Sequence, residues 1–380
     1  MISEIILKNF KSHQDTQLSF KNLNILTGVN GTGKSSLTQS LLLLRQSFKH
    51  NRLRRGVQLN KPLVDIGLGK DALFQSAEED IIRCAIKNGD NNTLGWDIEV
   101  PDKRLDATFL NFKNKPTKST GELEKFALFN EHFQYLSAER LAPQESYEKD
   151  DYEVETEKQL SKERGKGELI AHYLNYYGLK KGISYPMLLH PMNTNPNLLS
   201  QTNSWLREIS PNVNVAITDK EKYFEISYNF DVTDGFRTND FRAENVGFGI
   251  TYALPIIVAI LSAEKGSLII IENPEAHIHP SGQSKLSELM AIAAQCGIQL
   301  IIETHSDHII NGILVAVKKF EETKRGIDFK NVKLYLFERS ESGHSTAVKN
   351  IEVLSGGRIQ SPPKGFFDQI ALDRKYLRGF

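Results

Sequence analysis

The chain has 380 residues, of which 39% are hydrophobic and 25% charged, and its 47 basic residues balance its 47 acidic ones. This composition is that of an ordinary globular protein, and the length favours two lobes over one. The balanced charge excludes a strongly basic protein, so contact with nucleic acid would need a local patch. The two cysteines, Cys84 and Cys296, lie in unrelated contexts, which argues against a disulfide or a thiolate metal site.

Neither the start of the chain nor its most apolar stretch resembles a membrane or export signal. The first thirteen residues, MISEIILKNFKSH, contain no signal-peptide core before a small-residue cleavage site. The stretch 252–263 is too short to span a bilayer and contains Pro255. We therefore expect a cytoplasmic protein with no membrane partner.

The amino-terminal part predicts strands followed by a helix. Residues 3–10, 16–20 and 23–28 have the pattern of strands, and the leucines from Leu37 to Leu44 predict a helix buried on nearly all sides. Four more strand-like segments, separated by turn residues, follow between about residues 80 and 137. We interpret these four as an inserted β subdomain.

The middle and the carboxyl-terminal parts differ in pattern. The charged stretch 143–167 has almost no apolar periodicity and is expected to be an exposed or mobile connection. Two predicted helices and a hairpin follow, at 168–179, 197–210 and 212–230. From residue 245, helices alternate with apolar strands, which is typical of a parallel sheet covered on both faces.

These elements predict an α/β fold with a central mixed sheet flanked by helices, an inserted β subdomain and a helical lid region. There is no heptad run long enough for a long coiled coil. The expected parts are an amino-terminal lobe, a connection with its helices and hairpin, a carboxyl-terminal lobe and a tail, at residues 1–145, 146–240, 241–340 and 341–380.

A phosphate-loop pattern joins the third predicted strand to the first helix. Residues Gly28 to Ser35, GVNGTGKS, match G-x-x-x-x-G-K-[ST]. The glycines let backbone N–H groups approach phosphate oxygens, Lys34 supplies a charge, and Ser35 offers its hydroxyl to magnesium. The alternative is an ordinary glycine-rich turn. We predict a P-loop NTPase that binds ATP and Mg²⁺ through Asn30, Gly31, Thr32, Gly33, Lys34, Ser35 and Ser36.

An acidic strand supplies the second half of such a site. The strand 267–272 ends in Glu272, whose carboxylate would hold magnesium together with Ser35. The alternative is a core strand that ends in a solvated acid. Glu275, His277 and His279 follow and could suggest zinc, but turn histidines before the next helix are the simpler interpretation.

The next strand ends in IIETHSDHI, residues 301–309. Since the carboxyl ends of parallel strands meet at one edge of a sheet, His305 could reach a γ-phosphate or polarise the attacking water. A capping turn, in which Ser306 or Asp307 starts a helix, is compatible with this role.

The order of these pieces resembles the ABC-like ATPase heads of the SMC, RecF and OLD group. The resemblance is carried by the opening of the chain, by ENVGFGI in the place of the signature loop, by IENPEAHIHP and by ETHSDH. The chain is most similar to a bacterial family of stand-alone AAA-type ATPases, whose members also share a tail resembling GFFDQ, here Gly365 to Gln369. The resemblance covers residues 1–75 and 240–370 well and the middle only loosely.

The resemblance implies a head that closes as a homodimer, or as a higher homo-oligomer, around ATP. Gly247, Phe248 and Gly249 would then present N–H groups to the γ-phosphate held by the other subunit. ATP would drive closure and hydrolysis would reset it. Such relatives often accompany nucleases in bacterial anti-phage systems, which implies a separate effector protein, such as a nuclease.

Two departures from the family pattern affect the expected chemistry. The signature loop lacks the usual serine, for which Asn245 is a candidate substitute. Relatives in the wider ABC-like group usually carry Asp-Glu where this chain has Glu272 and Asn273, and an amide can orient water but cannot accept its proton. Glu275 is the nearest carboxylate that could act as the base and His305 is the second candidate, so we expect slow hydrolysis.

Three functions follow from these observations. The first is an ATPase that drives or gates a partner, and the second is a nucleotide-dependent binding module that hardly hydrolyses ATP. The third, an intrinsic nuclease, is disfavoured because the roughly seventy residues after ETHSDH lack a suitable acidic cluster.

Contact with DNA is suggested only by local basic runs. Arg52, Arg54 and Arg55 follow the first predicted helix and are the best candidates. Most such runs are solvated faces, and cations are favourable at a helix C-terminus in any case. Arg140 stands at a strand end, where it could face the nucleotide or a partner, or form a structural ion pair.

Overall fold

The computed structural model describes residues 1–90, 92–102, 105–114, 119–232, 235–341, 343–360, 366 and 369–378. The predicted tail motif GFFDQ lies largely outside these residues, since only Phe366 and the backbone of Gln369 are described. The predicted α/β fold with a central mixed sheet and flanking helices is confirmed.

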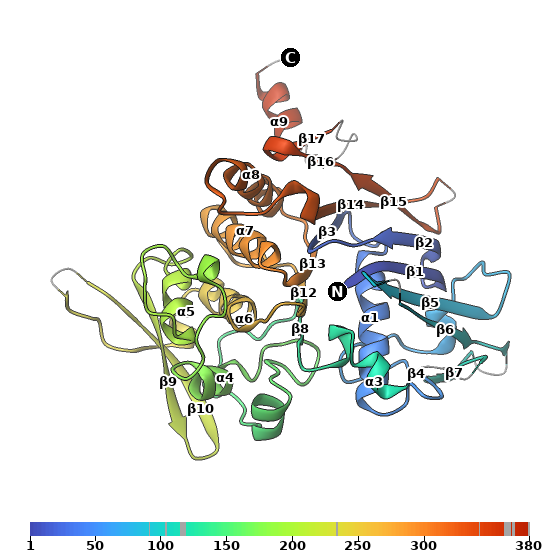
Figure 1. Cartoon of the computed structure of the whole chain (residues 1–380), viewed down its shortest axis with the longest axis horizontal. Coiled ribbons are helices and arrows are strands. Elements are labelled where there is room, and N and C mark those ends of the chain that lie inside the picture. The colour runs from blue at the N-terminus through green and yellow to red at the C-terminus, as the bar shows by residue number, and fades with distance from the viewer. Residues whose placement is uncertain are drawn as a thin grey trace.

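A six-stranded sheet forms the centre of the molecule (Figure 1). Its order is β15-β14-β3-β13-β12-β8, and all neighbours are parallel except β14 and β15. These strands are β3 (Leu23–Gly28), β8 (Phe133–Leu136), β12 (Leu268–Glu272), β13 (Gln299–Glu303), β14 (Val332–Arg339) and β15 (Thr346–Ile351).

Both faces of this sheet are buried, which explains the continuous apolar runs of its strands. Ile269 and Ile271 of β12 face one hydrophobic core, whereas Leu268 and Ile270 face a second. The first core contains side chains of α6 (Phe248–Ser262), α7 (Pro280–Gln295) and α8 (Asp307–Thr323), and the second contains those of α1 (Lys34–Lys49).

A second, four-stranded antiparallel sheet contains the first two strands of the chain. Its order is β2-β1-β5-β6, formed by β1 (Ile2–Phe10), β2 (His13–Ser19), β5 (Ile81–Asn88) and β6 (Thr93–Glu99). Two strands of the expected insertion therefore extend the sheet of the chain's start, because β5 pairs with β1 and β6 pairs with β5, whereas β8 joins the central sheet. Local sequence patterns predict a strand but not its pairing partner, because that partner is distant in the chain.

The charged stretch 143–167 was expected to be an exposed or mobile connection, and the expected exposure is wrong for its apolar residues. Tyr147, Val154 and Leu160 are fully buried, and Tyr147 exchanges two backbone hydrogen bonds with Phe224, at 2.8 and 2.9 Å. Three anchoring apolar side chains hold the segment in place without any helical or strand period. Periodicity alone does not detect such a segment.

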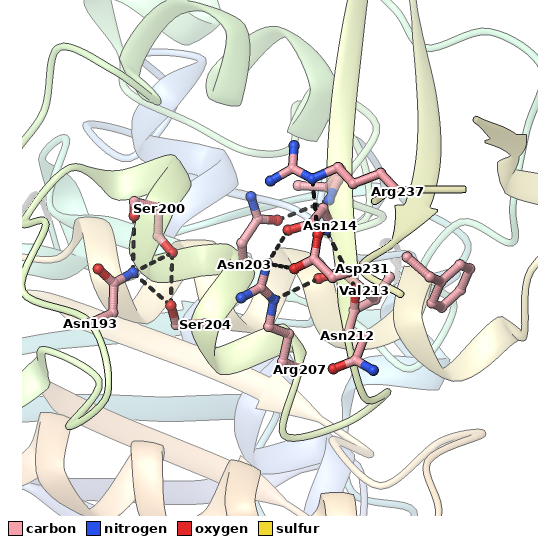
Figure 2. A network of polar contacts seen from close by, with 12 residues as sticks. Asn193, Ser200, Asn203, Ser204, Arg207, Asn212, Val213, Asn214, Asp231 and Arg237 are labelled. Atoms are coloured by element: carbon pink, nitrogen blue, oxygen red, sulfur yellow. Dashed lines mark hydrogen bonds and ion pairs between the residues drawn. The ribbon is translucent and has the colours of Figure 1, made fainter. Parts of the chain in front are cut away.

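The predicted helices and hairpin of the insert are confirmed as α4 (Ile170–Tyr177), α5 (Leu198–Leu206), β9 (Val213–Lys220) and β10 (Tyr223–Phe230), to which β11 (Phe241–Arg242) adds a short strand. A polar network ties this hairpin to the end of α5 (Figure 2). Asp231 accepts hydrogen bonds from Arg207 at 2.6 Å, Asn214 at 3.0 Å and Arg237 at 2.9 Å.

The remaining strands and α-helices of the described residues are short. They are β4 (Gly56–Gln58), β7 (Phe109–Asn111), α2 (Gly69–Ala72), α3 (Thr120–Leu123), β16 (Val353–Leu354), β17 (Arg358–Ile359) and α9 (Gln369–Leu377). In the described part of the chain the longest helix, α8, has 17 residues. No helix there combines the length and the apolar character needed to cross a bilayer.

Candidate nucleotide-binding site

Three neighbouring parallel strands end at the same edge of the central sheet. The phosphate loop leaves β3 at Gly28, β12 ends in Glu272, and β13 ends in Glu303. The strand register pairs Glu272 with Glu303 and Glu303 with Leu26. The phosphate loop, the acidic strand and the segment that leads to His305 therefore meet, as the topology requires.

The glycines of the phosphate loop are needed for both conformation and space. Gly28, Gly31 and Gly33 have positive φ angles of 136°, 74° and 101°. A Cβ atom on Gly28 would lie 2.2 Å from the Phe337 carbonyl oxygen, and one on Gly33 would lie 2.2 Å from Thr346 Oγ1. The loop thus lies directly against β14 and β15 before α1 begins at Lys34.

Lys34 closes the phosphate loop on itself. Its buried Nζ donates to the carbonyl oxygens of Gly28 at 2.9 Å and Val29 at 2.8 Å, and Thr32 Oγ1 also donates to Val29, at 2.9 Å. Burial lowers the pKa of Lys34, an effect that the nearby Glu303 opposes. Asn30 lies exposed on the same loop, and Ser36 is partly buried in the first turn of α1.

Glu303 is a site residue that the sequence analysis missed. Ser35 Oγ donates to Glu303 Oε1 at 2.8 Å, whereas Glu303 Oε2 is buried and has no hydrogen-bond partner among the described residues. Burial, with the charge of Glu272 second, raises the pKa of Glu303 to about 7. Because Glu303 ends an apolar strand as Glu272 does, the rule that selected Glu272 would have found it.

Glu272 lies beside this pair and is held by the end of β8. Its carboxylate accepts the hydroxyl of Tyr135 at 3.1 Å and the N–H of Ala138 at 3.2 Å, and burial raises its pKa. The hydroxyl of Ser35 and the carboxylates of Glu272 and Glu303 are hard oxygen donors of the kind that Mg²⁺ prefers. With the unpartnered oxygen of Glu303, these residues fit a magnesium ion.

Arg140 links the ends of β8 and β12 through hydrogen bonds to their carbonyl oxygens. Its Nη1 donates to the carbonyl oxygens of Ser137 at 2.7 Å and Glu272 at 2.6 Å, and its Nη2 donates to that of Asn273 at 2.7 Å. The side chain is 2% exposed, and burial lowers its pKa to about 10. In the described part of the chain it contacts carbonyl oxygens rather than an ion-pair partner, so the alternative of a structural ion pair is wrong.

Asn273 adopts a left-handed backbone conformation, with φ of 44°. Asparagine tolerates this region far better than most side chains with a Cβ atom. Its N–H donates to the Glu303 carbonyl oxygen at 2.8 Å, which fixes the turn after β12 against the end of β13. Asparagine at this position is thus favoured by the backbone conformation, although its amide cannot accept a proton as a general base would.

The carboxylate of Glu275 contacts the backbone of His305 rather than its imidazole ring. Glu275 accepts the Thr304 hydroxyl at 2.7 Å and the His305 N–H at 2.9 Å, so both of its carboxylate oxygens are engaged. Burial and the charge of Lys34 lower the pKa of His305, while a hydrogen bond to the Gly28 carbonyl opposes the shift. His305 thus lies beside the phosphate loop, and Ser306 caps α8 as predicted.

The neighbouring histidines serve the turn rather than a zinc ion. His279 caps α7, and the ring of His277 packs against those of Phe248 at 5.6 Å and Tyr252 at 4.7 Å between centroids. In the described part of the chain, Glu275, His277 and His279 form no cluster of metal-ligand spacing. The interpretation as turn histidines is therefore the better one.

One trio with suitable spacing lies elsewhere, at Asp151, Glu155 and His172. His172 Nδ1 accepts the N–H of Asp150 at 3.1 Å, which leaves the proton of the neutral ring on Nε2. That Nε2 faces Asp151 at 3.5 Å. The ring therefore offers a donor to the carboxylate and no free lone pair to a metal.

The signature loop, residues 244–250, packs against the turn that follows Glu272. Gly247 caps α6, and a Cβ atom on Gly249 would lie 2.6 Å from the His277 carbonyl oxygen. Asn245 and Gly247 are exposed and line a cavity of about 430 Å³ with Gly249, His277 and His279. Of the phosphate-loop residues that the structure describes, none lines this cavity.

Arg52, Arg54 and Arg55 lie beyond the opposite end of α1, about 24 Å from the phosphate loop at 1.5 Å per helical residue. All three are exposed. Arg52 donates to the Gln58 side chain, and Arg54 donates to Thr120 Oγ1 at 3.2 Å. No described carboxylate lies within ion-pair distance of these arginines.

Short stretches of the chain match two curated proteins. It is 28% identical over 108 residues to the DNA double-strand break repair Rad50 ATPase of Archaeoglobus fulgidus, covering 28% of this chain and 12% of that protein. It is 28% identical over 111 residues to the DNA replication and repair protein RecF of Francisella tularensis subsp. mediasiatica, covering 28% of this chain and 30% of that protein. The chain thus spans less than a third of either relative.

Solved structures and family models extend over more of the chain. The Smc head domain bound to the C-terminal domain of ScpA, derived from Pyrococcus furiosus, has a TM-score of 0.54 at 12% identity and covers 99% of both chains. The family described as protein of unknown function (DUF3696) matches residues 327–374. The family described as AAA domain, putative AbiEii toxin, Type IV TA system matches residues 23–311, more than half of the chain. The chain therefore belongs to this AAA-domain family and has the fold of an SMC head.

Proposed function

We propose that this chain binds ATP and Mg²⁺ where β3, β12 and β13 end, hydrolyses ATP slowly and closes as a homodimer that gates a separate effector. One observation carries the proposal most strongly. The phosphate loop, Glu272 and Glu303 converge at one sheet edge, with the hydroxyl of Ser35 bonded to Glu303 at 2.8 Å. Such a convergence of phosphate-binding and magnesium-binding groups is the arrangement that nucleotide hydrolysis requires.

The residues of the loop have distinct tasks in this scheme. Lys34 exchanges its two carbonyl partners for phosphate oxygens, and the N–H groups at the start of α1 face the same anion. Ser35, Glu272 and Glu303 would hold Mg²⁺. When bound, this ion neutralises charge that develops on the phosphates. His305, beside Gly28 and Lys34, would contact the γ-phosphate or the attacking water.

Slow hydrolysis is expected because no free carboxylate stands where relatives carry the general base. Asn273 can orient a water but cannot take its proton. Both oxygens of Glu275 are engaged by Thr304 and His305, which supports a positioning role for this residue. His305 is then the remaining candidate base of those predicted. The burial that lowers its pKa keeps the ring neutral and able to accept a proton.

Closure as a dimer is supported by the exposure of the signature loop. Asn245, Gly247 and Phe248 present polar and backbone groups at the N-terminus of α6, a 15-residue helix. A helix N-terminus favours an anion, here the γ-phosphate held by a second copy of the chain. The effector, a cytoplasmic location and a role in anti-phage defence rest on the family resemblance and on the toxin named in the family description.

The second candidate function is a nucleotide-gated binding module with little hydrolysis, which Asn273 favours. Turnover by purified protein separates the two functions, with Lys34→Ala as the control for a contaminating ATPase. Light scattering with a non-hydrolysable ATP analogue tests dimerisation. We expect slow, Lys34-dependent turnover and an analogue-dependent dimer. Turnover that survives in Lys34→Ala would contradict the proposed site, and binding without turnover would favour the module.

A further inference from the structure

A cavity of about 230 Å³ lies between the second half of α1, strand β8 and residues 152–162. No residue of the phosphate loop lines it, so it is distinct from the nucleotide site. Phe133, Tyr135 and Tyr152 contribute aromatic rings to its lining, and Tyr152 is exposed, which leaves the cavity open to solution. Concave sites with apolar and aromatic linings and a few polar groups are where proteins bind small ligands.

A buried cation without an ion-pair partner lines this cavity. Arg45 is 2% exposed, and its Nη1 donates to the carbonyl oxygens of Leu128 at 3.0 Å and Asn130 at 2.8 Å. Its Nε and Nη2 form no hydrogen bond or ion pair with a described residue, so these donors stay free. Burial lowers the pKa of Arg45 to about 10, an effect that the charges of Glu157 and Glu153 oppose.

A carboxylate without an ion-pair partner lines the same cavity. Glu153 lies in the turn Tyr152–Thr156, and no ion pair of its carboxylate is formed with a described residue. Burial raises the pKa of Glu153, an effect that the charge of Lys49 opposes. The other lysine and glutamate side chains of the lining form ion pairs, Lys49 with Glu157 and Lys162 with Glu148. Because desolvated charges are normally paired, a ligand that meets both Arg45 and Glu153 would be favoured.

We propose that this cavity binds a guanine base between Arg45 and Glu153. The guanidinium supplies only donors and the carboxylate only acceptors, so the best ligand presents two acceptors to one and two donors to the other. Guanine does this on a single plane, since its O6 and N7 accept from arginine while its N1–H and N2–H₂ donate to a carboxylate. Adenine has only one such donor group. The aromatic lining provides surfaces against which the base can stack.

Occupancy of the cavity would reach the nucleotide site through Tyr135, a link that rests on the proposed function. Phe133 and Tyr135 are two residues apart on β8, so their side chains leave the same face of the strand. Tyr135 lines the cavity, and its hydroxyl donates to Glu272 at 3.1 Å. A base that packs against Tyr135 therefore acts on a group that holds Glu272. By linkage, ATP and the base must then change the affinity for each other by the same factor.

Isothermal titration calorimetry with guanosine tests the site, because this nucleoside has no phosphate for the phosphate loop to bind. We expect one guanosine per chain with a Kd below about 1 mM, and binding of adenosine and of the zwitterion tryptophan at least about tenfold weaker. Inosine, which lacks only the N2 amino group, should bind at least about fivefold more weakly than guanosine. An oligothymidine with a single guanine shows whether the base is read within single-stranded nucleic acid, in which case it should bind more tightly than guanosine.

Glu153→Gln should weaken guanosine binding at least about tenfold and reduce the preference over inosine, because the amide accepts fewer hydrogen bonds than the carboxylate. Glu131→Gln is the matched control. The Glu131 charge also acts on Arg45, but this residue does not line the cavity, so the affinity should change by less than about threefold. Thermal unfolding shows that each variant is folded, which is expected because Glu153 is only partly buried.

The outcomes separate this inference from the proposed ATPase function. Lys34→Ala should lose the ATP analogue but keep guanosine. In the wild type the analogue should change the Kd of guanosine about fivefold or more, and Tyr135→Phe should remove this effect while still binding guanosine. The same effect in both proteins would overturn the link through the hydroxyl. No guanosine binding at millimolar concentration, equal binding of adenosine, or an unchanged affinity in Glu153→Gln would overturn the site, and the ATPase proposal would stand.

Discussion

Glu275 and His305 are joined by a 2.9 Å hydrogen bond from the His305 N–H to one oxygen of the Glu275 carboxylate. The other oxygen accepts the hydroxyl of Thr304, so this single side chain fixes the turn that presents the histidine. The residue therefore acts on His305 through geometry, and its removal should misplace the ring beside the phosphate loop.

We predict that Glu275→Ala lowers ATP turnover about tenfold, because a misplaced catalytic group loses part of its effect. In a His305→Ala background the same change should have almost no further effect, since its route to the chemistry is gone. Steady-state turnover of the four proteins measures this. A large additional loss in the double variant would instead show that Glu275 itself accepts the proton.

Asn273→Glu places a carboxylate where relatives carry the general base. We predict turnover at least about tenfold above the wild type, because a positioned base contributes about 10²–10⁴-fold and this one must first be accommodated. The φ of 44° is less favourable for glutamate, so a small loss of stability should accompany the gain. Asn273→Gln, which has the same length without the base, is the control. Equal turnover in the two variants would rule out a missing base as the cause of slow hydrolysis.

The raised pKa of Glu303 predicts a pH-dependent stability of the metal-free protein. Between its ordinary value of 4.5 and about 7, the folded state holds a proton that the unfolded state has lost. Stability therefore falls as pH rises through this window, by at most about 3 kcal/mol. Glu303→Gln mimics the protonated form and should match the wild type near pH 4 but exceed it at pH 8.

Chemical unfolding in chelator at several pH values measures this difference. Glu139→Gln serves as the control, because the exposed Glu139 carboxylate has no comparable burial. A stability difference between Glu303→Gln and the wild type that does not change with pH would contradict the assignment of the titration to Glu303.

Substitution by alanine should lower the stability of the fold at one glycine of the signature loop and not at another. A Cβ atom on Gly249 would lie 2.6 Å from the His277 carbonyl oxygen, whereas one on Gly247 would meet nothing within 4 Å. We predict that Gly249→Ala lowers the free energy of unfolding by about 1–3 kcal/mol and that Gly247→Ala leaves it nearly unchanged. If the loop meets nucleotide across a dimer, Gly247→Ala should still weaken analogue-dependent dimerisation, as light scattering would show. Equal stability of the two variants would contradict the tight packing at Gly249.

The three arginines beyond α1 give a quantitative prediction for DNA. If Arg52, Arg54 and Arg55 contact phosphates, duplex affinity should fall steeply with salt, at a slope of about 0.9 per contact on a double-logarithmic plot. Replacing all three by alanine should reduce this slope by up to about 3. Alanine at the exposed Lys21, Lys70 and Lys222 removes the same total charge and is the control. An unchanged slope in the triple variant would place any DNA contact elsewhere.

The amino-acid sequence by itself determined the strands that end at the site and the loop that leaves β3. The spacing of Gly28, Gly33, Lys34 and Ser35 suffices because these residues act through the local backbone, which neighbours in sequence control. The apolar runs of β12 and β13 likewise predicted a sheet buried on both faces, since burial follows from hydrophobicity alone.

Only the tertiary structure decided which groups meet. Glu303 reaches Ser35 across 268 residues of chain, and Arg140 holds the carbonyl oxygens of Glu272 and Asn273 from a different strand. The tertiary structure also decided that Tyr147, Val154 and Leu160 of the charged stretch are buried, and that β5 pairs with β1. Such contacts depend on how strands and loops are brought together over long separations, which no local pattern of residues encodes.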